Sequence, residues 1–176
     1  MYVKAKEVSL LGILLAVATM MILAASILKF NTLFFLGLAS FLLGVAIHET
    51  NLRMGAAYAI AAILLAFFLM PDKYECFTYG AFLGFIFIVE CIKKKKKPLK
   101  RTMFLAVKLC FFNICYLIPI LVWFPKLIIQ GFGDKMNPAV YIMLFCVGQV
   151  VLLLFDYVYD RFMEQFWPDF RRKLKL

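Results

Sequence analysis

Residues 8–28 read VSLLGILLAVATMMILAASIL, and no ionisable side chain lies between Glu7 and Lys29. A helix of about 20 apolar residues is long enough to cross the hydrocarbon core of a bilayer. This apolar core is longer than that of a signal peptide, and no convincing cleavage site follows it. The stretch therefore predicts a retained first transmembrane helix, over about residues 7–30.

Five further apolar segments follow, separated by short polar breaks. They predict helices over about residues 32–47, 54–70, 74–92, 102–124 and 139–163. The third segment is expected to end before Pro71, because proline disfavours the helical conformation in the residue that precedes it. Neither a domain boundary nor an internal repeat is visible. We therefore expect residues 1–176 to form a single transmembrane domain, an all-α bundle of six membrane-spanning helices.

Composition and charge support a membrane protein. The chain is 65% hydrophobic and 17% charged, which is too apolar for one small soluble core. Fifteen of the twenty Lys and Arg residues fall on one side of the predicted helices, seven of them within residues 93–101. By the positive-inside rule, this predicts a multi-pass protein of the cell membrane with both termini in the cytoplasm. Membrane lipids are the expected partner of the basic run. No nucleic-acid-binding module surrounds it, so we expect no nucleic-acid partner.

The signatures of catalysis are missing from the sequence. It has no phosphate-binding loop, no HExxH and no GxSxG motif. The five cysteines have no metal-binding spacing, and His48 is the only histidine. We therefore expect no enzyme activity, no catalytic residue, no cofactor and no metal site.

Three ionisable residues fall inside predicted helices, near their cytoplasmic ends: Glu90, Lys108 and Asp156. Charges in apolar surroundings are costly and usually pair. Their similar depths predict an intramembrane cluster in which Lys108 pairs with at least one carboxylate. Such a cluster could relay protons or solute, or it could be a buried ion pair that fixes the register of three helices.

The predicted outer ends of the helices carry polar and aromatic residues. Such a mixture can line a small-molecule pocket, and it is also typical of an ordinary aromatic belt. The candidate solute-binding residues are Asn31, Asp72, Tyr79, Trp123, Gln130 and Asn137.

Small residues in the first helix indicate close contact with another helix. Gly12 and Ala16 are four residues apart, which places both on one helix face where two backbones can approach closely. Four more small residues suggest a smooth contact surface: Ala18, Ala24, Ala25 and Ser26. We predict that this helix faces a partner subunit. The alternative is that the same face packs inward, against the third or sixth helix.

The chain resembles the S-component of energy-coupling factor transporters. The resemblance rests on its size, its six predicted helices, its cytoplasmic ends, the lack of an ATP site and the small residues of its first helix. That resemblance implies a substrate-binding membrane subunit for uptake of a small solute, a vitamin or a metal ion. It also implies a transmembrane coupling subunit, docked through Gly12 and Ala16, and partner ATPases. The connection between the first two helices is only about three residues, shorter than the family's gating loop. The gate over the solute is therefore expected in the connection over residues 125–138 instead.

The chain is also similar to small unassigned membrane proteins of Gram-positive bacteria, a likeness that implies no activity. It rests on Pro71-Asp72-Lys73, Tyr79-Gly80, Lys108 with Asn113, and Asp156-Tyr157. The alternative function is a non-catalytic membrane scaffold or cell-envelope assembly subunit. A transport subunit predicts an outer cavity ringed by polar groups, whereas a scaffold predicts a filled bundle.

Overall fold

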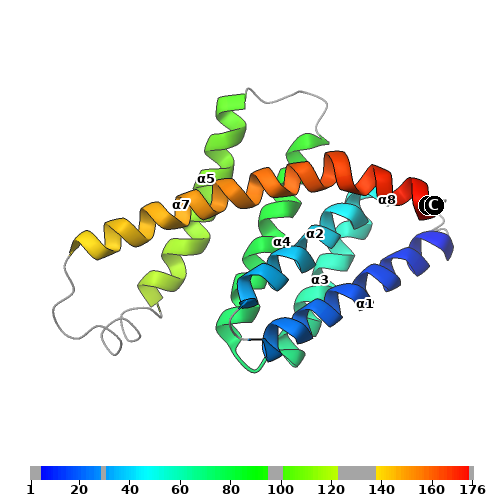
Figure 1. The fold of residues 1–176 in the computed structure, drawn as a ribbon, viewed down its shortest axis with the longest axis horizontal. Helices are drawn as coiled ribbons and strands as arrows, with labels where there is room; N and C mark the ends of the chain where they lie inside the picture. Colours follow the sequence, from blue (N-terminus) through cyan, green and yellow to red (C-terminus); the bar gives the residue numbers. More distant parts are fainter. Residues whose placement is uncertain (1–4, 29–30, 95–100, 123–137, 175–176) are drawn as a thin grey trace. The chain divides into compact units, whose positions relative to one another are not determined.

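The computed structural model describes residues 5–28, 31–94, 101–122 and 138–174, and every regular element in these ranges is a helix. The elements are α1 (Ala5–Ile27), α2 (Thr32–Glu49), α3 (Leu52–Leu69), α4 (Lys73–Lys93), α5 (Arg101–Val122), α7 (Pro138–Arg161), the π-helix η2 (Phe162–Phe166) and α8 (Trp167–Leu174) (Figure 1). The predicted all-α class is confirmed, and the six predicted segments match α1 to α5 and α7 within three residues at every end.

Four of these helices are long and apolar enough to cross a membrane: α1, α2, α3 and α4. Among the described residues, α5 adds a shorter apolar stretch, Met103–Cys115. The chain divides into two compact units. Unit 1 comprises Met1–Pro98 and Trp167–Leu176, and unit 2 comprises Leu99–Phe166. The single transmembrane domain stays a prediction.

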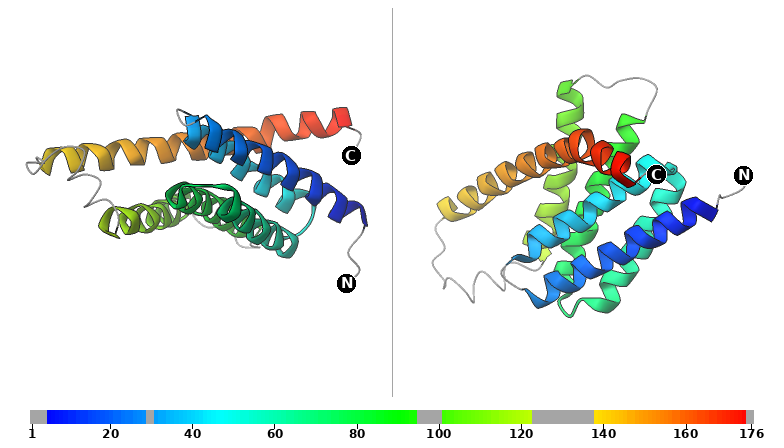
Figure 2. Two further views of the ribbon diagram at one scale, coloured as in Figure 1. Left: turned by 90° about the horizontal axis from the view of Figure 1, so that it is seen from below. Right: turned by 45° about the vertical axis from the view of Figure 1, so that its right-hand side comes forward.

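Unit 1 is built around α2, which contacts α1, α3 and α4, while α3 also contacts α1 and α4. Short links make consecutive helices run in opposite directions, as the ribbon views show (Figures 1 and 2). Most of α2 between Leu36 and Ile47 is buried. Small residues let neighbouring backbones approach α2 closely. The small buried residues of α2 are Gly37, Ala39, Ser40, Gly44 and Ala46.

The helix ends in unit 1 are fixed by proline and by lysine. Met70 precedes Pro71 and is extended, with φ −84° and ψ 125°, so α3 stops at Leu69 as predicted. The Lys73 ammonium donates to the carbonyls of Phe67 and Met70, at 2.8 and 3.4 Å. Lys94 likewise donates to the carbonyl of Ile47 at 2.6 Å. These lysines satisfy carbonyls that the last turn of a helix leaves without a partner.

The small residues of α1 lie on two opposite faces, so the prediction of one smooth contact surface is wrong. Ala18 and Ala25 are fully buried, together with Leu14 and Ile22. The spacing of these four residues places them on one face, and the Leu14 carbonyl on that face accepts a hydrogen bond from Tyr58 of α3 at 3.3 Å. Gly12 and Ala16 are exposed on the other face, and a Cβ added at Gly12 would meet nothing within 4 Å.

Unit 2 pairs α5 with α7 through polar side chains. Lys108 bonds Asp156, and Asn113 bonds Gln149. Position rises along α5 as it falls along α7, so the two helices are antiparallel. Few side chains described in this unit are buried: Lys108, Leu152, Tyr159 and Met163. Exposed apolar residues on both helices, such as Met103 and Leu154, suit a lipid environment.

Gly55 offers a test of the packing in unit 1. It is buried in α3, and a Cβ at this position would overlap Cγ1 of the buried Ile47. We expect Gly55→Ala to lower the free energy of unfolding by about 1–3 kcal/mol, because an overpacked site forces its neighbours to move. Unfolding of the purified protein in a denaturing detergent titration measures this.

The matched control is Gly80→Ala in α4, where a Cβ would meet nothing within 4 Å. Alanine is the better helix former, so this variant should be neutral or more stable by up to about 1 kcal/mol. Equal stability of the two variants would contradict the packing described for α2 and α3.

Candidate functional site

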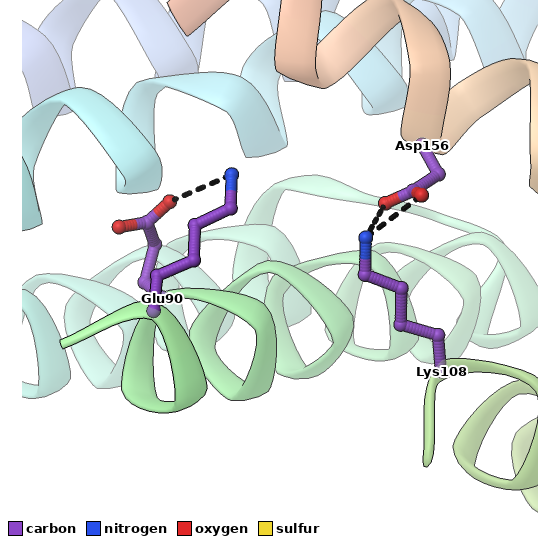
Figure 3. A network of polar contacts seen from close by, with 4 residues as sticks. Glu90, Lys108 and Asp156 are labelled. Carbon is purple, nitrogen blue, oxygen red and sulfur yellow. Dashed lines mark hydrogen bonds and ion pairs between the residues drawn. The ribbon is translucent and has the colours of Figure 1, made fainter. Parts of the chain in front are cut away.

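The structure brings Lys108 and Asp156 together as an ion pair (Figure 3). The Lys108 ammonium lies 2.5 and 2.8 Å from the two carboxylate oxygens of Asp156. It also sits 4.1 Å from the centroid of the Phe104 ring, one turn earlier on α5. The side chains are 6% and 17% exposed. A charge in such surroundings is tolerated when an opposite charge and further contacts compensate it, and Lys108 has both.

An amide pair extends this polar contact along the same two helices. The Gln149 side-chain amide donates to the Asn113 carbonyl oxygen at 2.6 Å. Asn113 is five residues from Lys108, and Gln149 is seven residues from Asp156. The two contacts therefore form a polar seam that follows α5 and α7 for about two helical turns. Its groups can hold a proton, bind a polar solute, or fix helix register.

Glu90, the third member of the predicted charge cluster, lies in unit 1. It is 2% exposed, and its carboxylate is 3.8 Å from the Lys93 ammonium on the next turn of α4 (Figure 3). The three-residue cluster with Lys108 and Asp156 stays a prediction.

The candidate solute-binding residues differ in their surroundings. Asn31 and Asp72 are exposed at the starts of α2 and α4, which lie at the same end of unit 1 because consecutive helices alternate in direction. Tyr79 is fully buried in α4, and among the described residues its hydroxyl has no hydrogen-bond partner. Trp123, Gln130 and Asn137 lie outside the described residues.

Glu49 is a structural anchor that sequence reasoning missed. Its carboxylate accepts a hydrogen bond from the Trp167 indole at 2.9 Å and lies 3.5 Å from the Arg171 guanidinium. Trp167 and Arg171 are four residues apart on α8, hence on one face. The signal in the sequence was the four-residue spacing of Trp167 and Arg171. That spacing does not identify which of the ten acidic residues of the chain contacts them.

Comparison with family models, with curated proteins and with solved structures found no match to this chain. Among the described residues, no group of three or more His, Cys, Asp or Glu side chains could hold a metal ion. The candidate functional residues are therefore the polar seam in unit 2 and, separately in unit 1, the buried Tyr79 and the exposed face of α1 with Gly12 and Ala16.

The Lys108–Asp156 pair can be tested by a double-mutant cycle. We expect Lys108→Met to destabilise the protein by about 3–5 kcal/mol, because it leaves Asp156 as an uncompensated charge. Adding Asp156→Asn should recover part of that loss, since the double variant has no unpaired charge. Detergent unfolding of the four proteins measures the coupling. Additive effects of the two substitutions would show that the pair does not contribute to stability.

Proposed function

We propose that the chain is a substrate-binding membrane subunit for uptake of a small solute, vitamin-like or a metal ion. It works with a transmembrane coupling subunit and partner ATPases and has no catalytic activity of its own. The observation that carries this proposal is the open face of α1 at Gly12 and Ala16. Small residues on a surface exposed to lipid bring no benefit there, whereas they allow close approach of a second helix.

Tyr79 supports the binding of a solute. A buried hydroxyl that lacks a hydrogen bond costs about 1–3 kcal/mol, and a polar solute would supply the missing partner. Tyr79 also lies on the same face of α4 as Glu75, one turn nearer the helix start. This end of unit 1 also carries Asn31 and Asp72, so the solute would enter there.

The proposed topology is six crossings, with both termini in the cytoplasm. It rests on the charge bias of the sequence together with the lengths of α1 to α4 and the apolar sequences of α5 and α7.

Single cysteines test this topology in a background without the native cysteines. A cysteine at Asp72 or at Asp134, which lies outside the described residues, should react with an impermeant maleimide in intact cells. A cysteine at Arg172 should react only after the cells are permeabilised. Labelling of position 134 only after permeabilisation would contradict the six crossings.

The docking face is tested by Gly12→Leu with Ala16→Leu. We expect this double variant to fold with unchanged detergent stability, because the positions are open. It should lose copurification of a coupling subunit by at least about tenfold, since leucine holds the partner helix away. Affinity purification from native membranes, followed by native mass spectrometry, measures the partners and any retained metabolite.

The matched control is Ile13→Leu with Val17→Leu, two exposed positions on a neighbouring face of α1 where bulk is conserved. This control should keep the partner. Loss of folding in the Gly12 and Ala16 variant, or full retention of the partner, would contradict the proposal.

A membrane scaffold is the second candidate, and the filled centre of unit 1 around α2 favours it. A scaffold offers its surface in the plane of the membrane and needs no solute cavity. The same purification distinguishes the two functions. Cell-envelope proteins without an ATPase or a metabolite would indicate the scaffold, and a coupling subunit with ATPases would indicate uptake.

A further inference from the structure

The C-terminal end of α2 holds two other elements of unit 1 in place. Lys94, directly after α4, donates to the Ile47 carbonyl, and Glu49 binds Trp167 and Arg171 of α8. A carboxylate in the last turn of a helix is opposed by the helix dipole, whose negative end lies there. Glu49 is therefore stabilised in this position by its two partners on α8, and α8 is fixed beside the end of α2 (Figure 1).

The fixed α8 presents its remaining cations to solvent. Arg172 and Lys173 are exposed, and among the described residues neither pairs with a carboxylate. Arg171 stays 53% exposed while it contacts Glu49. The exposed Lys93 and Lys94 lie at the same end of unit 1, because Lys94 reaches the end of α2. Five cations therefore lie at the same end of unit 1, with Lys93 3.8 Å from the Glu90 carboxylate.

The depth of this cation cluster is set by the length of its helices. A helix of 21 residues such as α4 spans about 31 Å, close to the thickness of the hydrocarbon core. The last residue of α4 is Lys93, so it lies at the level of the lipid head groups when α4 crosses the membrane. A tryptophan is typical of that level, and Trp167 is held there by Glu49.

We propose that Lys93, Lys94, Arg171, Arg172 and Lys173 form a binding surface for the phosphate groups of anionic phospholipids. Glu49 acts as a positioning residue that fixes α8. The ligand is the lipid of the membrane that the helices cross, because exposed cations at head-group depth meet lipid phosphates before any soluble anion. This inference is independent of the proposed uptake function, since it uses none of the solute-binding or docking residues.

The experiment titrates the purified full-length chain in mild detergent with short-chain phosphatidylglycerol and, separately, phosphatidylcholine, and native mass spectrometry counts the bound lipids. We expect the anionic lipid to bind more tightly and its affinity to fall as salt is raised. Arg172→Gln with Lys173→Gln should weaken that affinity by about thirtyfold, because each cation near a lipid surface contributes about fivefold. The charge-conserving control, Arg172→Lys with Lys173→Arg, should keep it.

Glu49→Gln supplies a second measurement, because it removes the charge that contacts Arg171 but keeps an acceptor for Trp167. It should speed amide exchange over residues 167–174 and weaken the binding of the anionic lipid. The control is His48→Ala, at an exposed position next to Glu49, which should leave lipid binding unchanged. The proposal is overturned if the two lipids bind equally or if the affinity for the anionic lipid does not change with salt. It is also overturned if neither Arg172→Gln with Lys173→Gln nor Glu49→Gln weakens that affinity. Displacement of the lipid by an equal concentration of inorganic phosphate would also overturn it, as it would identify a soluble ligand.

Discussion

Hydrophobic burial cannot hold two helices together in lipid, because the lipid tails around them are as apolar as their side chains. Membrane helices associate instead through close backbone packing and through polar contacts. Unit 1 depends mainly on the first, with the small residues of α2 and Gly55 of α3 at its centre. Unit 2 depends on the second, since an ion pair and an amide pair join α5 to α7.

The same constraint explains the position of the charges. The ends of a membrane-spanning helix leave carbonyls without partners, and lysine can reach them from a neighbouring segment. Lys73 does this at the end of α3, and Lys94 does it at the end of α2. Lys94, the second lysine of the basic run, is therefore part of the packing of unit 1. Lys93, the first lysine of the run, instead lies 3.8 Å from the Glu90 carboxylate.

Local rules predicted the helices well. The apolar runs set the helix bounds within three residues, and Pro71 set the end of α3. Pairing across helices was harder to predict, because it depends on rotation about each helix axis. Gly12 and Ala18 are both small residues of α1, yet one faces outward and the other is fully buried. The contacts of Glu49 with Trp167 and Arg171 join positions more than a hundred residues apart, so no local pattern predicts them. That Lys108 pairs with a carboxylate was foreseeable from the cost of a lone charge, and within unit 2 that carboxylate is Asp156.

The burial of α2 has a consequence for how freely its sequence can vary. Lipid accepts almost any bulky apolar side chain, so the exposed positions of α1 and α3, such as Met20 and Phe68, have many acceptable replacements. Neighbouring helices accept only the shape that fits them. A position such as Ala39 or Ser40 is fully buried, so a larger residue there must displace a neighbouring helix. The covered helix should therefore diverge most slowly, and its sequence should remain similar in distant relatives after the lipid-facing residues have changed.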